Sequence, residues 1–141
     1  MNTDTIKTII RDIPDFPSPG IIFKDITPVL QDPAALSYVI DKLAEYAEVI
    51  KPTAIVAIEA RGFVFGSVLA YKLGVSLVPV RKVGKLPWTC IREEYALEYG
   101  TNAVEMHEDA LKPGDRVLIV DDLLATGGTA RAATKLVERL G

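Results

Sequence analysis

The stretch 117–129 constrains the fold of this chain more than any other part of it. Its first four residues, 117–120, are branched and apolar, which predicts a strand buried on both faces, as in a parallel sheet. Asp121 and Asp122 follow at the carboxyl end of that strand, and a glycine-rich turn, 126–129, then leads into a predicted helix. A buried strand, a turn and a helix in this order are typical of an α/β protein.

The turn has the chemistry of a phosphate site. Gly127 and Gly128 carry no Cβ, so the backbone can approach an anion closely. The first turn of a helix presents N–H groups and a partial positive charge, and Thr126 and Thr129 add hydroxyl donors. A capped helix after a buried strand is the simpler interpretation, because threonine and glycine are ordinary capping residues. The turn matches neither the lysine-containing P-loop nor the Gly-x-Gly-x-x-Gly dinucleotide motif.

The two aspartates favour a ligand over a plain helix cap. Adjacent carboxylates repel each other unless a cation, hydrogen-bond donors or solvent intervene. They suit the hydroxyls of a sugar, or a metal ion reached through water or through the sugar. Asp121 and Asp122 beside a phosphate-binding turn therefore predict a site for a sugar phosphate.

Helical and strand patterns alternate along the chain, which predicts right-handed βαβ units and a parallel sheet flanked by helices. Ligands of such sheets bind beyond the carboxyl ends of the strands. Three unusual loops fall at that edge, namely 59–63, 81–87 and 121–129. The predicted helices are 3–12, one between Asp32-Pro33 and Lys51-Pro52, 63–73 and 129–140. The predicted strands are 53–58, 76–80, 102–106 and 116–121, with irregular structure at 14–20, an irregular or extended segment at 84–100 and a turn at 112–115.

The composition is that of a globular protein, with 49% hydrophobic and 25% charged residues. A length of 141 residues predicts a single domain. The net charge of −3 disfavours a nucleic-acid partner, and no apolar run is long enough to cross a membrane. With one cysteine and no signal-peptide pattern at its start, the chain is expected to be cytoplasmic and to lack a disulfide framework.

Several segments together carry a family resemblance. Residues 121–129 read Asp-Asp-Leu-Leu-Ala-Thr-Gly-Gly-Thr, which is similar to the 5-phosphoribosyl 1-pyrophosphate (PRPP) signature of the type I phosphoribosyltransferases, in the version of the branch that uses adenine. Residues 16–28 resemble the base-binding hood of that branch, 59–63 its pyrophosphate loop, and 81–87 with 95–100 its mobile catalytic loop. The resemblance covers nearly the whole chain, in the order that the family shows.

The resemblance implies the type I phosphoribosyltransferase fold and a role in purine salvage, in which a nitrogen of adenine displaces pyrophosphate from PRPP to give AMP. It further implies Mg²⁺ as cofactor, PRPP and adenine as substrates, and a homodimer. The implied layout of the single domain 1–141 is a helix and hood in 1–32 and a core in 33–141, with a mobile loop at 82–100. The family continues with a further strand, so a missing C-terminal strand and a truncated chain are expected.

Individual roles follow from chemistry and from the resemblance. Asp121 and Asp122 would bind the ribose hydroxyls and stabilise an oxocarbenium-like charge, while Arg61 would hold the departing pyrophosphate through two hydrogen bonds. Glu98 is expected to manage a proton on the purine, and Tyr99 to close the hood. The predicted PRPP contacts are Arg61, Gly62, Arg81, Lys82, Lys85, Asp121, Asp122, Ala125, Thr126, Gly127, Gly128 and Thr129. The predicted adenine contacts are Ile22, Phe23, Lys24 and Leu123.

Two other functions stay open. A PRPP-sensing regulatory protein would keep the phosphate turn but would need a recognition helix or a basic patch, and the sequence has neither. A 6-oxopurine phosphoribosyltransferase would, by the resemblance, carry an acid at the position of Ala125. The alanine therefore favours adenine over hypoxanthine or guanine.

Overall fold

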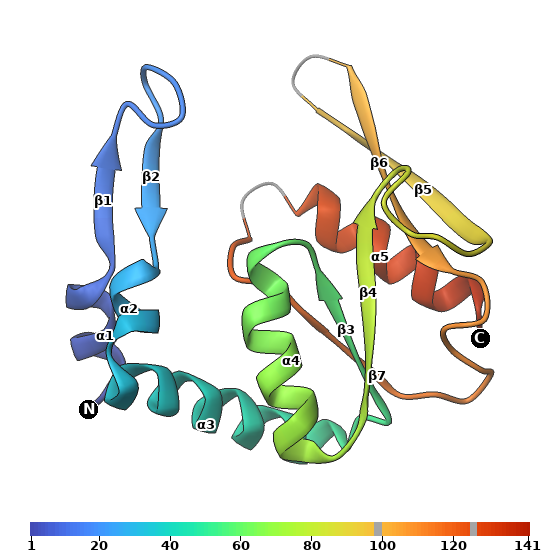
Figure 1. The fold of residues 1–141 in the computed structure, drawn as a ribbon, viewed down its shortest axis with the longest axis horizontal. Helices are drawn as coiled ribbons and strands as arrows, with labels where there is room; N and C mark the ends of the chain where they lie inside the picture. The colour runs from blue at the N-terminus through green and yellow to red at the C-terminus, as the bar shows by residue number, and fades with distance from the viewer. Residues whose placement is uncertain (98–99, 125–126) are drawn as a thin grey trace. The chain divides into compact units, whose positions relative to one another are not determined.

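The computed structural model of this chain describes residues 1–97, 100–124 and 127–141 (Figure 1). By its internal contacts the chain divides into two compact units, Met1–Leu43 and Ala44–Gly141. The first unit contains a two-stranded hairpin and the second a five-stranded sheet. Within the described residues, no helix is both long enough and apolar enough to cross a membrane.

The first unit differs from its sequence prediction in the segment 11–25. The predicted helix 3–12 ends at residue 9, and the segments 11–14 and 22–25 pair as antiparallel strands, which the sequence did not predict. The helix prediction was therefore wrong at 11–12, whereas the irregular structure predicted at 14–20 is confirmed for 15–20, between the two strands. The elements are α1 Thr3–Ile9, β1 Arg11–Pro14, β2 Ile22–Asp25, α2 Thr27–Gln31 and the first part of α3 Pro33–Ile50.

Cross-strand ion pairs explain why this hairpin forms. Arg11 lies opposite Asp25 and pairs with it at 2.7 Å, while Lys24 lies opposite Asp12 and pairs with it at 2.5 Å. Opposite charges at directly facing positions stabilise an antiparallel pair. These partners are 12 to 14 residues apart in sequence, so hydrophobic periodicity does not reveal them.

The start of α3 agrees with its prediction. Oδ1 of Asp32 accepts hydrogen bonds from the N–H groups of Ala34 and Ala35 at 2.9 and 3.3 Å. The proline that follows the cap lacks an N–H group at a position where a helix needs none. Because α3 runs through the boundary between the two units, the division into a 1–32 segment and a 33–141 core stays a prediction.

The second unit is built on a mixed sheet with the strand order β5-β6-β4-β3-β7. Strand β3 is parallel to β4 and β7, whereas β6 is antiparallel to both β4 and β5. The predicted parallel sheet is thus correct for the centre, and the segment 84–100, which was predicted as irregular or extended, supplies the antiparallel strand β5. The strands are β3 Ala54–Ile58, β4 Ser76–Lys82, β5 Cys90–Ala96, β6 Thr101–His107 and β7 Val117–Val120.

Two helices cover opposite faces of this sheet, α4 Arg61–Leu73 and α5 Gly128–Arg139. A Cβ added at Gly66 of α4 would lie 2.6 Å from Cβ of Ala57 and 3.7 Å from Ile55, so α4 packs closely on that face of β3. The alternate residues Val56 and Ile58 instead join the core beneath α5. That core consists of Val56, Ile58, Val78, Val80, Val104, Met106, Ala132, Ala133 and Leu136.

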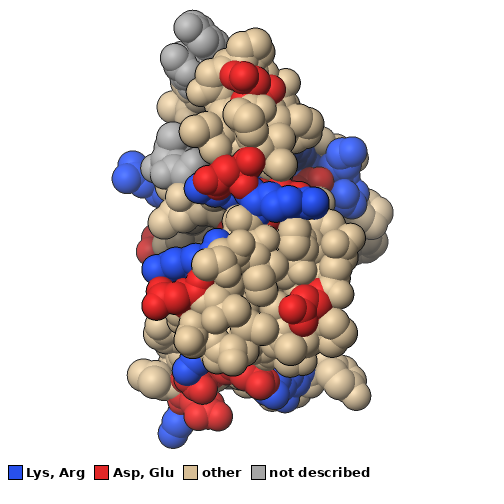
Figure 2. Space-filling model, turned by 90° about the vertical axis from the view of Figure 1, so that its left-hand side faces the viewer, with Lys and Arg blue, Asp and Glu red and all other residues tan. Residues whose placement is uncertain are grey.

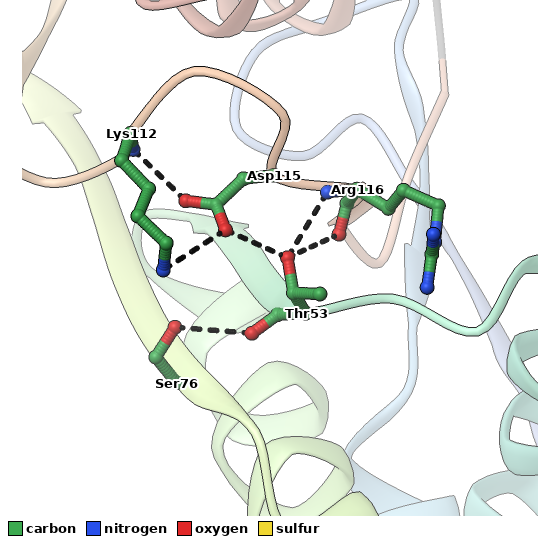
Figure 3. A network of polar contacts seen from close by, with 5 residues as sticks. All are labelled: Thr53, Ser76, Lys112, Asp115 and Arg116. Atoms are coloured by element: carbon green, nitrogen blue, oxygen red, sulfur yellow. Dashed lines mark hydrogen bonds and ion pairs between the residues drawn. The ribbon is translucent and has the colours of Figure 1, made fainter.

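A polar network ties the amino ends of β3, β4 and β7 together (Figure 3). The Thr53 hydroxyl donates to Oδ1 of Asp115 at 2.9 Å and accepts the N–H of Arg116 at 3.0 Å. Oδ2 of Asp115 accepts the N–H of Lys112 at 2.9 Å, which closes the predicted turn, and Ser76 donates to the Thr53 carbonyl at 3.4 Å. Hydrogen bonds from the Lys112 N–H and the Thr53 hydroxyl hold the pKa of Asp115 below its usual value.

Charges of both signs are interspersed on the face of the molecule drawn in Figure 2. Lys and Arg side chains there lie next to Asp and Glu side chains instead of gathering into a patch of one sign. Such a surface gives that face no strong field for steering a charged macromolecule.

Candidate active site

The carboxyl ends of β3, β4 and β7 open onto a pocket of about 270 Å³. Because β3 runs parallel to both of its neighbours, the segments that follow these strands emerge at one edge, as the sequence predicted. Residues from the ends of the three strands, from the starts of α4 and α5, and from β5 and β6 line this pocket: Ile58, Glu59, Ala60, Arg61, Lys82, Tyr95, Val104, Asp121, Asp122, Leu123, Leu124, Gly127, Gly128, Thr129 and Ala130.

Asp122 is paired with Arg61 across the pocket. Nε of Arg61, at the first position of α4, lies 2.8 Å from Oδ2 of Asp122, and the Asp122 side chain is only 6% exposed. An ion pair that is buried on one side fixes the orientation of both groups. The structure thus brings together a residue predicted to hold pyrophosphate and one predicted to hold the ribose.

Asp121 occupies a different environment from its neighbour. Its side chain is exposed, and its Oδ1 accepts the N–H of Asp122 at 2.8 Å. Partial desolvation, together with a hydrogen bond and charge repulsion from the Asp122 carboxylate, raises the pKa of Asp121 to about 6. A carboxyl group that titrates near neutral pH inside a pocket is a frequent mark of a functional site.

The close packing of α4 against β7 depends on Gly62. A Cβ at this position would lie 2.9 Å from the carbonyl oxygen of Val120 and 3.2 Å from both Cα and Oδ1 of Asp121. Only glycine lets the first turn of α4 approach the end of β7 this closely. Gly62 was predicted to admit the PRPP backbone contact, and its packing keeps Arg61 beside the two aspartates.

The phosphate turn leads directly into α5. Gly127 adopts φ 83°, a left-handed conformation that favours glycine, and its carbonyl accepts the N–H of Arg131 at 2.9 Å. Gly128 and Thr129 form the first turn of the helix and line the pocket. Two other predicted contacts, at 125–126, lie outside the described residues.

The predicted basic cluster separates into two environments. Lys82 lines the pocket, whereas Arg81 and Lys85 are not among the residues that line it. The Arg81 guanidinium instead pairs with Glu59 at 3.4 Å and lies 5.8 Å from the centre of the Phe63 ring. A guanidinium held by a carboxylate and an aromatic ring has a structural role in the absence of a ligand.

Comparison with known proteins places this geometry in a family. The model of the phosphoribosyl transferase domain matches residues 25–141. The adenine phosphoribosyltransferase of Carboxydothermus hydrogenoformans is 62% identical over 136 residues, which cover 96% of this chain and 80% of that protein. This chain belongs to the adenine phosphoribosyltransferases.

Solved structures of adenine phosphoribosyltransferases have the same fold. The crystal structure of the Thermoanaerobacter pseudethanolicus protein has a TM-score of 0.96 at 59% identity, over 99% of this chain and 81% of that chain. The Saccharomyces cerevisiae protein, complexed with D-2,5-dideoxy-2,5-imino-altritol 1,6-bisphosphate and adenine, has a TM-score of 0.90 at 44% identity, over 97% of this chain and 80% of that chain. The predicted type I phosphoribosyltransferase fold is confirmed.

The residues predicted to hold adenine are split between the two units. Leu123 lines the pocket of the second unit, whereas Ile22, Phe23 and Lys24 belong to β2 of the first. Within the hairpin, the Phe23 ring meets the Phe16 ring edge-on at 5.2 Å, and Ile22 is 64% exposed. A site shared between these residues, as in the expected base-binding hood, stays a prediction.

Several residues that line the pocket were outside the predicted site, and Tyr95 and Glu59 are those with polar side chains. Tyr95 reaches it from β5, and recognising the alternation of the segment 90–96 as a strand would have been the signal for it. Glu59 belongs to the segment 59–63 that resembles the pyrophosphate loop. Its position directly after β3 indicates that it lies at the edge of the sheet where ligands bind. Glu98 and Tyr99, the predicted proton carrier and hood residue, lie outside the described residues.

Proposed function

We propose that this chain transfers the 5-phosphoribosyl group of PRPP to adenine and so produces AMP and pyrophosphate. One observation supports this most: the pocket joins Asp121 and Asp122 to the glycine turn of α5, in a chain 62% identical to an adenine phosphoribosyltransferase. The turn suits a 5′-phosphate, and the aspartates suit the hydroxyls of the attached ribose. The proposed site residues remain those predicted from the sequence.

Charge development on the ribose gives the aspartates their proposed role. The bond from the anomeric carbon to pyrophosphate breaks as the bond to a purine nitrogen forms, and positive charge builds on the ribose. Two opposite unit charges about 4 Å apart attract by about 4 kcal/mol at an effective dielectric of 20. A stabilisation of that size in the transition state corresponds to roughly a thousandfold in rate. Asp121 is the exposed carboxylate that would supply it, beside Asp122.

Departing pyrophosphate would be held by Arg61 and Lys82, which both line the pocket. The Arg61 guanidinium is already oriented by Asp122 at 2.8 Å, so little of its freedom would be lost on binding. Arg81 and Lys85 do not line the pocket, and we propose that their charges act on the pyrophosphate from a greater distance.

Adenine would lie between the side chains of Phe23 and Leu123, while backbone groups of Ile22 and Lys24 would recognise its amine. Glu98 would manage the proton of the purine and Tyr99 would close the hood. A backbone carbonyl accepts from an amine but cannot donate to an oxo group. This preference, together with relatives that are named adenine phosphoribosyltransferases, disfavours both the 6-oxopurine enzyme and the PRPP-sensing regulator.

Mg²⁺ is the proposed cofactor. Within the described residues no three His, Cys, Asp or Glu side chains gather as a metal site. Magnesium, however, is commonly held by one or two carboxylates together with substrate phosphates and water. Asp121 and Asp122 fit that pattern, through water or through the ribose, and the ion would neutralise charge on the pyrophosphate.

A homodimer in the cytoplasm completes the proposal. Helix α4 presents an exposed apolar stripe, with Val64 39%, Val68 41% and Tyr71 90% exposed on one helix face. Exposed apolar stripes of this kind often mark an interface. Analytical ultracentrifugation of the chain and of Tyr71→Glu tests the dimer. The proposed cytoplasmic location follows from the composition.

Incubation of the purified chain with adenine, PRPP and Mg²⁺ tests the activity. We expect AMP and pyrophosphate in equal amounts and a much slower reaction with hypoxanthine. Faster turnover of hypoxanthine would assign the chain to the 6-oxopurine class instead. Binding of PRPP with no turnover of any purine would favour a regulatory protein.

A further inference from the structure

Glu59 connects the end of β3 to the end of β4 through both its backbone and its side chain. Its N–H donates to the carbonyl of Val80 at 3.0 Å. Oε1 of the side chain accepts the N–H of Lys82 at 2.6 Å, and Oε2 lies 3.4 Å from Nη2 of Arg81. The side chain is only 14% exposed, so these contacts are partly shielded from water.

A carboxylate in a pocket for pyrophosphate needs an explanation, because two negative groups repel each other. Burial alone would raise the pKa of Glu59, but the Lys82 N–H, Arg81 and the charge of Lys85 outweigh it and lower the pKa. Glu59 therefore stays ionised, with each oxygen already accepting a donor. That leaves it poorly suited to act as a base or as a metal ligand.

The two basic residues that Glu59 contacts differ in where they lie. Arg81 packs against Phe63, and its Nε is buried without a hydrogen-bond partner. Lys82, whose N–H is held by Glu59, lines the pocket. Adjacent residues of a strand point to opposite faces, so fixing the backbone at residue 82 decides which of the two cations faces the pocket.

We infer that Glu59 is a positioning residue for pyrophosphate: by accepting the Lys82 N–H and pairing with Arg81, it fixes the end of β4 with Lys82 in the pocket. This inference rests on the proposed function. It gives the acidic residue of the loop 59–63 a role that requires no contact with substrate.

The Glu59→Ala variant should raise the KM for PRPP about tenfold, since a misplacement of about 1 Å in a positioning group is enough for an effect of this order. The KM for adenine should change less than about twofold, because uniform loss of the fold would affect both substrates. Glu59→Gln should recover most of the loss, since its amide oxygen can still accept the Lys82 N–H. Glu93→Ala is the matched control: Glu93 also pairs with an arginine, Arg139, at 3.4 Å but does not line the pocket.

A double-mutant cycle separates positioning from a general structural effect. If Glu59 acts through Lys82, Glu59→Ala should add less than about twofold to the KM for PRPP once Lys82→Ala is present. Should Glu59→Ala not fold, Glu59→Asp replaces it in the same cycle, because its shorter side chain keeps the charge but draws the carboxylate away from the Lys82 N–H. Additive effects, equal changes in both KM values, or a Glu59→Gln variant as impaired as Glu59→Ala would each overturn the inference. Absence of turnover in the unmodified chain would instead overturn the proposed function.

Discussion

Two aspartates lie at opposite ends of β7, and their electrostatic environments are opposite. Asp115 comes before the strand and Asp121 directly after it. At the amino ends, Asp115 accepts hydrogen bonds from Lys112 and Thr53, which hold its pKa below the usual value. At the carboxyl ends, Asp121 lies exposed in the pocket beside a second carboxylate, with its pKa raised to about 6. The first setting favours the ionised aspartate in the folded chain, and the second disfavours it.

Under the proposed function, this difference separates an edge of the sheet that stabilises the fold from an edge that binds substrate. A carboxylate whose oxygens accept hydrogen bonds within the protein stabilises the fold, and those oxygens are not available to a ligand. A charge that the fold leaves under-compensated destabilises the free protein slightly and gains its partners when a ligand arrives. An aspartate therefore has a different role at each edge: Asp115 stabilises the turn before β7, and Asp121 is available to a ligand after β7.

Matched substitutions at the two edges should give the largest contrast. Asp121→Asn should lower kcat by roughly a hundred- to a thousandfold, the loss expected for one group that stabilises charge in a transition state. Asp115→Asn, at the other edge, should leave kcat within about twofold, because neither Asp115 nor its hydrogen-bond partners Thr53 and Lys112 line the pocket. Steady-state assays at saturating adenine and PRPP measure both values. Equal losses of activity in the two variants would contradict the division between the edges.

The pH dependence of the reaction should reveal the raised pKa of Asp121. Below about pH 6 this carboxyl group takes up a proton and can no longer stabilise positive charge on the ribose. We expect kcat/KM for PRPP to fall about tenfold per pH unit on the acid side of that value. The fall should disappear in Asp121→Asn, whose side chain does not titrate. A profile that is flat down to pH 4.5 would mean that the ionised form is not needed.

Local patterns in the sequence were sufficient for the parts of the fold in which neighbours along the chain decide the structure. The segment from β3 through α4 to β4 and the strand–turn–helix around the phosphate turn agree with their predictions, as does the start of α3 at Asp32. The hairpin of β1 and β2 and the strand β5 were missed. Their pairing depends on partners distant in sequence, such as Arg11 with Asp25, and strand formation is governed by such context.

The same distinction applies to the site. Sequence reasoning placed Arg61, Asp121 and Asp122 at one edge, because all three follow strands of a parallel pair. It could not show that Arg61 pairs with Asp122 and that Glu59 holds Arg81, since those choices depend on side-chain distances of 2.8 and 3.4 Å in the folded chain. Residue type and spacing therefore predicted which of these residues share one edge of the sheet, but not how their side chains pair.

A smaller effect is expected on stability at the amino edge. Asp115→Asn should lower the melting temperature at pH 7.5 by about 3–6 °C, because the ionised carboxylate accepts hydrogen bonds that hold the turn and Thr53. Its pKa is depressed in the folded chain, so this contribution is present above the unfolded pKa near 3.8 and is lost as the pH falls through the lower folded value. The difference between the two melting temperatures should therefore shrink as the pH is lowered below 3.8, as measured by calorimetry. Thr134→Val, which removes a hydroxyl on the exposed face of α5, should change the melting temperature by less than about 1 °C.

The smallest expected effect has the opposite sign and lies at the carboxyl edge. The pKa of Asp121 is raised from 3.8 to about 6 in the folded chain, so the folded state binds this proton more tightly than the unfolded state. Its contribution to stability is complete below pH 3.8 and is lost as the pH rises through 6. Asp121→Asn removes that loss and should raise the melting temperature by about 1–2 °C at pH 7.5, a small gain because solvent screens an exposed group. The gain should vanish at pH 3.5. If Asp121→Asn loses activity while its melting temperature rises, the raised pKa of this carboxyl group is linked to its function. A lower melting temperature at pH 7.5 would instead place Asp121 with Asp115 among the groups that stabilise the sheet.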